Sequence, residues 1–389
     1  MSNILIIAMG YPPVAGGVET YSEEVARAYL RKGLIPIVIT KTFGERGWRE
    51  VTYSEGRIRL YNTGRVSQPV AFARMLWQCA NLLCRRSFEF IHATTWRPAL
   101  AALMFSRRTS LILTVHGREV LNYPFFLKRP MIEVLRRANV VVTVSSATMG
   151  IARAALHGAN PNGKWVVAFN GITHPTEARA HERRLDNGRT TVRLLSLSRL
   201  VPRKNVQGCI TALAELRAEG LSNFEYWIGG RGPMLEDLRQ AVADAGLEEQ
   251  VRFLGYVEDA DVPELYKWCD VFLHPQTHVG QGNDFEGFGL VIADAMSFGC
   301  AVLAGEAGGP KEFVKDGVRG LVVDGLDSVA LKAALRELLT DPQLRQRLGA
   351  SARDFALRNL SWDEHVDRIL DGIPIQAGTA KPRGSEDVR

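Results

Sequence analysis

The sequence predicts an α/β protein of two Rossmann-like domains that face each other across a cleft. Short apolar segments of strand length alternate with helical segments, several of these strands run into glycine loops, and one polar stretch without periodicity divides the chain. At 389 residues, the chain is also longer than a single hydrophobic core usually serves. We therefore expect a first domain over 1–173, a linker over 174–190 and a second domain over 191–360.

The first half begins with a strand, a glycine loop and a helix, which is the opening unit of a Rossmann-type domain. The strand Asn3–Ala8 leads into a loop with Gly16 and Gly17, and a helix follows over Val18–Arg31. The loop can admit a phosphate or a sugar, but its spacing is not the Gly-x-Gly-x-x-Gly of dinucleotide binders. Further apolar segments predict strands at Ile35–Thr40, Phe88–Ala93, Ser110–Val115, Val140–Ser145 and Trp165–Phe169.

Between these strands lie a basic excursion, which runs to about Gln68, and a basic helix. The helix is predicted over Pro69–Arg86 because apolar residues recur there at helical spacing, at Val70, Ala73, Leu76, Trp77, Ala80, Leu83 and Cys84. It carries Trp77 and several arginines, so it either faces the core or lies on a membrane surface.

The second half repeats the alternation of strands and helices. Apolar segments predict strands at Thr191–Ser198, Glu225–Gly230, Val251–Leu254, Val271–His274, Ala301–Ala304 and Gly320–Val323. Helices are expected at about Ser328–Leu339, Asp341–Leu357 and Ser361–Leu370. The last helix, over 361–372, is expected to pack back on the first domain, and the tail 373–389 to be flexible.

The composition is that of a globular protein. Hydrophobic residues make up 46% and charged residues 23%, and no apolar run reaches the roughly 18 residues that cross a bilayer. The start of the chain lacks a basic segment and predicts a strand rather than a signal peptide. Because the five cysteines are scattered without a Cys-x-x-Cys pair, buried thiols in a reducing cytosol are favoured over disulfides or zinc ligands.

The charge is divided unequally between the halves. Residues 1–173 hold 22 Lys and Arg against 9 Glu and no Asp, a net charge of +13, whereas the remainder holds 26 against 33, a net charge of −7. Such an asymmetry predicts that the first half faces something anionic. The chain has no recognisable nucleic-acid motif, which favours a membrane surface over nucleic acid.

One stretch, Asp284–Ala295, combines the acids Glu286 and Asp294 with two glycines and an apolar run. Glu286 precedes Gly287 and Gly289, which allow close approach of a ligand to the backbone, and a buried helix is predicted from Leu290. The amides of Phe288, Gly289 and Leu290 are the unpaired donors of a helix N-terminus, where an anion such as a phosphate binds. Asp294 lies one turn inside that helix, so the two acids can hold opposite ends of one ligand.

Two further groups of candidate residues follow strands. His116 and Gly117 come directly after Ser110–Val115, and Arg199 and Lys204 lie in the loop after Thr191–Ser198. Ligands of open α/β sheets bind at the carboxyl ends of the strands. We expect the cations to neutralise a diphosphate and His116 to line the same site, although a structural histidine and ordinary surface charge are the alternatives.

The motifs, taken in order, resemble a known enzyme family over nearly the whole chain. The chain is similar to the family-4 retaining glycosyltransferases, also called glycosyl transferases group 1, which have the GT-B fold. The segments that carry this resemblance are Pro12–Glu19, Thr114–Gly117, Ser198–Asn205, Gly229–Pro233, Phe253–Val257, His274–Pro275, Glu286–Leu290, Gly299–Val302, Gly308–Gly309 and Asp316–Val323.

The resemblance implies roles for single residues. Arg199 and Lys204 match the pair that binds the donor diphosphate, and Glu286 matches the first acid of the family's Glu-x7-Glu motif, which binds the donor sugar. Asp294 stands at the position of the second acid, where the family usually has a glutamate that binds ribose hydroxyls. Aspartate is shorter than glutamate by one methylene. The catalytic set is then His116, Arg199, Lys204 and Glu286. The donor-binding set is Gly16, Gly17, Arg199, Lys204, Gly230, Glu286, Phe288, Gly289, Leu290 and Asp294.

The resemblance also implies the reaction and its place in the cell. The first domain binds the acceptor and the second binds a GDP- or UDP-linked sugar, from which a hexose passes with retention to a glycan or lipid-linked glycan in cell-surface polysaccharide or glycoconjugate biosynthesis. No metal or other cofactor is expected, because fixed cations and helix-end amides stabilise the leaving diphosphate. Asp259 and Asp261 form an Asp-x-Asp motif of the kind that binds metals. Because the pair comes directly before Val262, we interpret it as the cap of a helix. We expect a cytoplasmic enzyme, peripheral on the inner face of the membrane.

Other functions stay open from the sequence. The acceptor can be a soluble small molecule, and a nucleotide-sugar epimerase shares this architecture, although Arg199 and Lys204 favour transfer. A nicotinamide dehydrogenase lacks support because the glycine fingerprint is absent. Because Asp294 departs from the family's usual glutamate, a non-catalytic protein that only binds its ligand is a further alternative. The segment Gln276–Phe285 is longer than is usual for the family, and the sequence assigns it no role.

Overall fold

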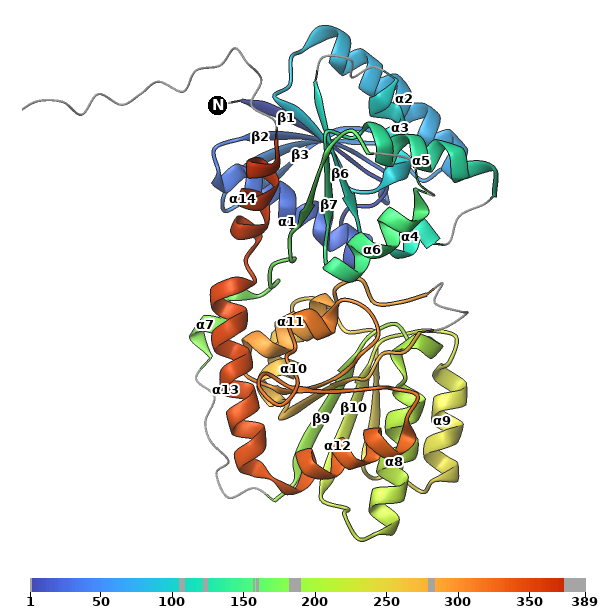
Figure 1. Ribbon diagram of the computed structural model, residues 1–389, viewed down its shortest axis with the longest axis vertical. Helices are drawn as coiled ribbons and strands as arrows, with labels where there is room; N and C mark the ends of the chain where they lie inside the picture. Colours follow the sequence, from blue (N-terminus) through green and yellow to red (C-terminus); the bar gives the residue numbers. More distant parts are fainter. Residues whose placement is uncertain are drawn as a thin grey trace, which may run out of the picture.

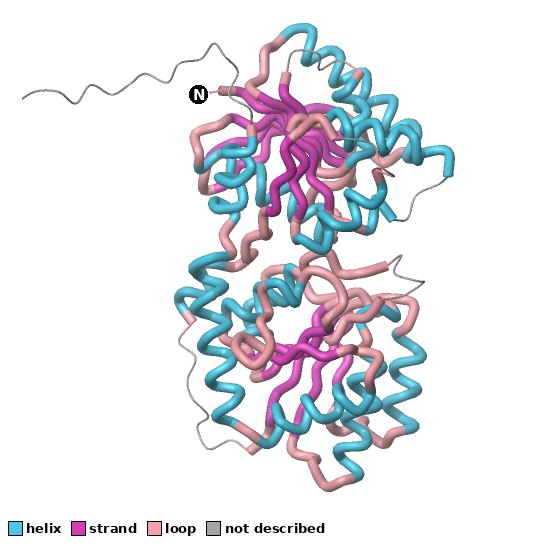
Figure 2. Tube along the Cα trace, viewed as in Figure 1, coloured by secondary structure: helices cyan, strands magenta, loops and turns pink. Residues whose placement is uncertain are grey.

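The computed structural model has two α/β halves, each built on its own sheet (Figure 1). It describes residues 2–104, 109–121, 125–156, 158, 161–181, 190–278 and 284–373. The first sheet has eight strands in the order β3-β4-β2-β1-β5-β6-β7-β8, and the second has six in the order β11-β10-β9-β12-β13-β14. Figure 2, which is coloured by secondary structure, shows helices on both faces of each sheet. Both sheets have the doubly wound arrangement that the alternation of strands and helices predicts.

The first half contains eight strands and six α-helices within the described residues. The strands are β1 (Asn3–Ala8), β2 (Ile35–Thr40), β3 (Gly47–Tyr53), β4 (Gly56–Asn62), β5 (Phe90–Ala93), β6 (Ser110–Val115), β7 (Val140–Thr143) and β8 (Lys164–Val167). The helices are α1 (Gly17–Arg31), α2 (Gln68–Arg85), α3 (Trp96–Leu103), α4 (Arg118–Leu121), α5 (Lys128–Arg137) and α6 (Ser146–Ala155), with a 3₁₀ turn η1 (Phe125–Leu127).

Strand β1 shows why these segments are apolar throughout. Ile4 and Ile6 pack toward α1 and the C-terminal helix α14 (Trp362–Gly372), whereas Leu5 and Ile7 pack toward α2, α3 and α5 on the opposite face. Successive side chains of a strand point to opposite faces. A parallel strand that is covered on both sides therefore reads as a continuous apolar run.

The basic excursion before Gln68 contains a β-hairpin that the sequence analysis did not predict. Strand β3 pairs antiparallel with β4, which in turn lies parallel to β2, and the hairpin forms one edge of the sheet. Most side chains of β3 are exposed, since β3 lies outermost. An edge strand of this kind has too few apolar residues for its alternation to be recognised.

The second half contains six strands and the remaining helices. The strands are β9 (Val192–Leu197), β10 (Phe224–Gly229), β11 (Val251–Gly255), β12 (Val271–His274), β13 (Ala301–Gly305) and β14 (Leu321–Val323). The helices are α8 (Val206–Ala218), α9 (Leu235–Asp244), α10 (Val262–Trp268), α11 (Leu290–Ser297), α12 (Ser328–Thr340) and α13 (Pro342–Asn359), with 3₁₀ turns η2 (Pro202–Lys204) and η3 (Pro310–Glu312). Asp261 precedes α10 as expected, but its side chain makes no capping hydrogen bond.

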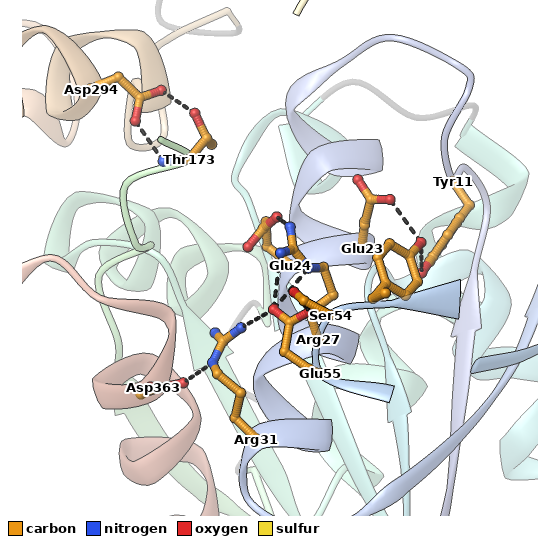
Figure 3. A network of polar contacts seen from close by, with 11 residues as sticks. Tyr11, Glu23, Glu24, Arg27, Arg31, Ser54, Glu55, Thr173, Asp294 and Asp363 are labelled. Carbon is orange, nitrogen blue, oxygen red and sulfur yellow. Dashed lines mark hydrogen bonds and ion pairs between the residues drawn. The ribbon is translucent and has the colours of Figure 1, made fainter. Parts of the chain in front are cut away.

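The chain crosses between the halves twice. The first crossing lies at about Thr173, just before the segment predicted as a linker, and that segment contains helix α7 (Pro175–Ala180), which lies beside α11 of the second half. After α13, helix α14 returns to the first half and packs on α1 (Figure 1). Arg31 of α1 connects three elements, because it bonds to Glu55 at the β3–β4 turn at 2.8 Å and to Asp363 of α14 at 2.7 Å (Figure 3).

Candidate functional site

The carboxyl ends of the two sheets meet where their loops touch. A Cβ placed on Gly287 would lie 2.0 Å from the carbonyl oxygen of His116, and one on Gly117 would lie 2.4 Å from Cζ of Phe285. Asp284 lies between Arg118 of the first half, at 3.5 Å, and Arg203 of the second, at 3.2 Å. The segment Asp284–Leu290 therefore packs directly on the loop that follows β6.

Glu286 is the centre of a charged cluster in the second half. Its Oε2 accepts hydrogen bonds from Nη1 of Arg203, at 2.5 Å, and from Nζ of Lys204. Burial raises the pKa of the Glu286 carboxyl, but Lys204 above all and Arg203 outweigh burial and hold it well below its usual range. Glu286 is therefore an ionised acceptor that two cations orient.

Lys204 is nearly buried, with 8% of its surface exposed, and also lies 3.2 Å from Nε2 of His274. Burial, followed by the charge of Lys204, lowers the pKa of His274 to about 4, so its imidazole is neutral. Nε2 of His274 also lies 3.4 Å from Oε2 of Glu286, so this ring nitrogen contacts both the ammonium and the carboxylate. Contacts with His274 and Glu286 fix the position of the Lys204 ammonium group.

Arg199 lies on the loop between β9 and η2 but not within this cluster. Its side chain is exposed, and within the described chain its guanidinium makes no hydrogen bond or ion pair. The structure thus brings Lys204 and Glu286 together and leaves Arg199 available for a ligand. The role of the pair on a diphosphate stays a prediction.

His116 forms the facing wall, at the end of β6. Its Nε2 donates to the carbonyl oxygen of Thr94 at 3.0 Å, and its backbone amide donates to Glu119 at 2.7 Å. A carbonyl only accepts, so Nε2 carries the proton and Nδ1 is left as an acceptor. Burial lowers the pKa of His116, which keeps the ring neutral. Because Nδ1 has no partner among the described residues, this neutral ring is suited to accept a hydrogen bond from a hydroxyl.

A buried polar network lies beneath His116 and connects it to α14. The ring of Tyr21 packs edge-on to that of His116, with centroids 4.7 Å apart. The Tyr21 hydroxyl lies 2.7 Å from Oγ1 of Thr114 and 2.9 Å from Nε2 of His365, whose Nδ1 lies 3.0 Å from the carbonyl oxygen of Phe169. Since that carbonyl only accepts, His365 carries its proton on Nδ1 and Tyr21 donates to Nε2.

The same network determines which ring nitrogen of His92 carries the proton. With Tyr21 donating to His365, Thr114 donates to the Tyr21 hydroxyl and accepts from Nε2 of His92 at 2.8 Å. Nδ1 of His92 then accepts from Tyr29, whose hydroxyl lies 3.0 Å away. Burial is the main cause that lowers the pKa of His92 to about 3 and that of His365 to about 4.

These neutral histidines predict a loss of stability in acid. Their pKa values lie below the roughly 6.5 of an unfolded histidine, so below that pH the unfolded chain binds more protons than the folded one. The free energy of unfolding should fall from about pH 6.5 toward pH 4, by about 1.4 kcal/mol per pH unit for each such proton. Urea unfolding of the wild type and of His365→Gln over this pH range checks the prediction. The free energy of unfolding should fall less steeply with decreasing pH in the variant than in the wild type. An equal dependence on pH would contradict the assignment of His365 as a neutral buried histidine.

The glycine-rich segments lie at the meeting edge. Gly16 precedes α1 at φ 157°, and a Cβ on Gly17 would lie 3.9 Å from Cδ1 of Leu290, so this loop faces the start of α11. Gly289 precedes α11 at φ 84°, in the left-handed region that favours glycine. Among the described residues, the amides of Phe288, Gly289 and Leu290 have no acceptor. They remain candidates for binding an anion.

Gly230 has a different position from the other glycines. A Cβ there would lie 1.8 Å from the carbonyl oxygen of Ser198, at the end of β9, and φ is 129°. Its amide donates to the carbonyl oxygen of Gly255 at 2.6 Å. The structure therefore requires glycine here to bring the loops after β9 and β10 together, and a contact of Gly230 with the donor stays a prediction.

Asp294 has partners that the sequence analysis did not predict. Its two carboxylate oxygens accept from the amide of Thr173, at 2.6 Å, and from Oγ1 of Thr173, at 2.7 Å (Figure 3). Thr173 lies at the first crossing between the halves, so Asp294 anchors that crossing to α11. Each of these oxygens keeps a further lone pair, so the expected contact of Asp294 with ribose hydroxyls stays a prediction.

Sequence reasoning also missed residues of this site. Arg203 and His274 contact the Glu286 cluster, and Thr173 contacts Asp294. Arg203 stands next to Lys204 in the sequence and His274 ends β12, so position at a strand end was the signal for both. Thr173 gave none. Residues 279–283 of the long segment Gln276–Phe285 lie outside the described residues, and Gln276 is buried against the carbonyl oxygens of Gly305 and Ala307.

Comparisons with known proteins decide the family. The model "Glycosyltransferase Family 4" matches residues 15–174, and the model "Glycosyl transferases group 1" matches residues 179–355. A GDP-mannose-dependent alpha-(1-6)-phosphatidylinositol monomannoside mannosyltransferase from Mycolicibacterium smegmatis is 31% identical over 385 residues, which cover 95% of this chain and 97% of that one. The chain belongs to glycosyltransferase family 4.

Two further comparisons agree with this assignment. A GDP-mannose-dependent monoacylated alpha-(1-6)-phosphatidylinositol monomannoside mannosyltransferase from Corynebacterium glutamicum is 27% identical, over 95% of this chain and 98% of that one. The structure of a sucrose-phosphate synthase from Thermosynechococcus elongatus superposes with a TM-score of 0.78 at 18% identity, over 95% of this chain and 98% of that one. This glycosyltransferase therefore has the GT-B fold, as the sequence predicted.

Proposed function

We propose that this glycosyltransferase moves mannose from GDP-mannose to a lipid-linked glycan or phosphatidylinositol-type glycolipid, with retention at the anomeric carbon. The observation that carries the proposal is the cluster of Glu286, Lys204 and Arg203, which lies across the meeting edge from His116. The names of the relatives from M. smegmatis and C. glutamicum support this choice of donor and acceptor.

The chemistry follows from the charges at this edge. As the bond between the anomeric carbon and the phosphate oxygen breaks, negative charge builds on the leaving diphosphate, and Lys204, Arg199 and the start of α11 are aimed at it. Glu286 and Nδ1 of His116 accept hydrogen bonds from the sugar hydroxyls. The acceptor oxygen attacks the same face, and its proton passes to the leaving phosphate oxygen. These cations perform the task of a metal ion, so we propose that transfer needs no divalent cation.

A donor assay tests this proposal. With GDP-mannose and vesicles containing phosphatidylinositol mannoside, the enzyme should release GDP and form a mannosylated lipid, with full turnover in excess EDTA. Turnover lost in EDTA and restored by magnesium or manganese would contradict metal independence. An isomerised sugar without transfer would indicate an epimerase instead.

Thermal shift with single nucleotide sugars identifies the donor independently of the acceptor. A ligand at about 100 times its dissociation constant stabilises the folded protein by about 2.7 kcal/mol. GDP-mannose should raise the melting temperature, and UDP-glucose at the same concentration should raise it less. The reverse order would assign a UDP-linked hexose.

A membrane-bound acceptor requires a surface that meets the membrane. Helices α2, α3 and α5 form one layer on the first half, and three large apolar side chains are exposed on it: Trp77 at 58%, Met104 at 64% and Phe126 at 75%. Arg85, Arg86 and Arg129 are exposed on the same layer. We call these six residues the basic–apolar patch. They support peripheral binding at the inner, cytoplasmic face of a membrane, and no described helix is long and apolar enough to span one.

The structure narrows the residues expected to meet lipid. The inner face of α2, with Met75, Cys79 and Leu82, is buried in the core, so this helix contributes only its outer face. Arg74 donates to the carbonyl oxygen of Thr63, and Arg136 and Arg137 pair with Glu133. The sequence also offers Arg107, Arg108 and the apolar segment Tyr123–Leu127 as lipid contacts, but Arg107, Arg108 and residues 123–124 lie outside the described residues.

Liposome flotation tests the patch. The protein should float with vesicles that contain anionic lipid, and binding should weaken as salt rises, because each basic residue near the surface contributes about 1 kcal/mol and the Debye length shortens. Arg85→Glu, Arg86→Glu and Arg129→Glu together should abolish flotation. The same change at Lys315, Arg347 and Arg358 of the second half is the control and should have little effect. No binding at low salt would favour a soluble acceptor.

A further inference from the structure

We propose that Glu312 is a positioning residue that holds the two halves together and thereby sets Glu286 against His116. The carboxylate of Glu312, in η3 of the second half, accepts hydrogen bonds from the amides of Ser146 and Ala147 at the start of α6 in the first half. Both distances are 2.8 Å, one to each carboxylate oxygen. Neither the family assignment nor the proposed reaction gives this residue a role.

The bond geometry favours a strong contact. The first amides of a helix have no partner within the helix, and the helix dipole makes its start attractive to an anion. At α6, Oγ of Ser145 accepts from the amide of Thr148 at 3.1 Å, so the helix has its own cap. Glu312 takes the two amides that this cap leaves free. Hydrogen bonds to an ionised acceptor are about twice as strong as neutral ones.

The turn that carries Glu312 also contacts Glu286. The amide of Gly309 donates to the carbonyl oxygen of Glu286 at 2.9 Å. A Cβ on Gly308 would lie 2.1 Å from that same oxygen, and one on Gly309 would lie 2.1 Å from the carbonyl oxygen of Gly287 and 2.8 Å from Oγ of Ser145. The turn therefore has no space to move between the Glu286 loop and α6. When Glu312 holds α6, the backbone of Glu286 is held at a fixed distance from the first half.

This arrangement separates donor binding from turnover. Lys204, Arg203 and His274 orient Glu286 from within the second half, so a donor can bind there without Glu312. Nδ1 of His116 reaches the same sugar only when the halves are joined. This expectation rests on the proposed function. Loss of the Glu312 contact should therefore lower kcat and leave donor affinity nearly unchanged.

The test compares Glu312→Ala with wild type in two measurements. The kcat of Glu312→Ala should fall by about 10- to 100-fold, the scale of losing two charge-assisted hydrogen bonds, while the dissociation constant of GDP-mannose changes less than about threefold. A nitroxide pair should show a broader or longer distance between the halves. Cys84 is exposed on α2, the other four cysteines are buried, and Ala243→Cys on α9 provides the second site. Glu264→Ala, an exposed acid on α10, is the control and should match wild type in both measurements.

A double variant distinguishes positioning from simple helix capping. Ser146→Asp adds an acid in the first turn of α6 on the first half alone, which should restore the melting temperature of Glu312→Ala. It cannot join the halves, so kcat and the nitroxide distance should stay changed. Recovery of kcat together with stability would show that Glu312 only caps α6 and would overturn the proposal.

The two measurements also separate this inference from the proposed reaction. The nitroxide distance needs no donor. An unchanged distance in Glu312→Ala would overturn the inference even if GDP-mannose is a substrate. A changed distance in a protein that does not use GDP-mannose would support the contact and contradict the donor assignment.

Discussion

Replacing Lys204 by alanine should lower kcat by at least about 100-fold, which is the scale of removing one preorganised electrostatic partner of a transition state. In the proposed reaction the ammonium of Lys204 stabilises the charge that develops on the leaving diphosphate, and in the structure it contacts Glu286. The substitution leaves the ionised Glu286 with Arg203 as its cationic partner in a nearly buried site. Breaking a buried ion pair costs about 3–5 kcal/mol, so the free energy of unfolding should fall toward this range. Steady-state kinetics and urea unfolding measure the two effects.

Arg199→Ala is the informative comparison. Arg199 is exposed and makes no ion pair with the described residues, so alanine there should lower kcat by a similar factor without a change in unfolding free energy. Lys315→Ala, at an exposed lysine of the second half, should change neither quantity. If Lys204→Ala and Arg199→Ala both keep wild-type turnover, the assignment of the diphosphate site is wrong.

Replacing Gly287 by alanine should nearly abolish transfer while each half stays folded. A Cβ on Gly287 would lie 2.0 Å from the carbonyl oxygen of His116, and its other close neighbour is Oγ1 of Thr148 at 3.6 Å. Both atoms belong to the first half, so the clash opposes the joining of the halves and not the packing within the second. We expect kcat to fall by about 100-fold or more, because reacting groups moved by about 1 Å lose this much.

The affinity of Gly287→Ala for the donor checks that interpretation, since it should stay near the wild-type value, whereas the melting temperature should fall about as far as in Glu312→Ala. Gly150→Ala in α6 is the control, because a Cβ there meets nothing within 4 Å and alanine favours the helix by about 1 kcal/mol. Turnover of Gly287→Ala within a few-fold of wild type would show that the halves do not join in this way during the reaction.

The strands and most helices were predictable because a covered parallel strand is apolar on both faces. Strands β1, β2, β6 and β12 have the bounds that their apolar runs predicted. The β3–β4 hairpin was not recognised, since most side chains of its outer strand are exposed and few of them are apolar. Helix α7 was missed because it has few residues and lies in a polar segment.

The functional residues divide in a similar way. Glu286, Lys204 and His116 were predicted because each follows a strand or precedes a helix at a sheet's carboxyl end, and the structure brings Lys204 and Glu286 into contact. The partners of Asp294 and Glu312 were not predictable, since Thr173 lies 121 residues from Asp294 and Ala147 lies 165 residues from Glu312. Local pattern contains no information about such pairs.

The sequence alone determined the two-domain α/β architecture, the family and the residues at the strand ends, because periodicity, glycine loops and motif order are local properties. Only the tertiary structure decided which of those residues meet. It directed Lys204 and Arg203 onto Glu286 and assigned Asp294 to the crossing between the halves. It also placed the carboxylate of Glu312 on the first amides of α6. The Glu286 cluster depends on how separate loops of the second half meet, and the contacts of Asp294 and Glu312 depend on how the two halves approach each other. Backbone amides that donate to a distant carboxylate have no signature in the sequence.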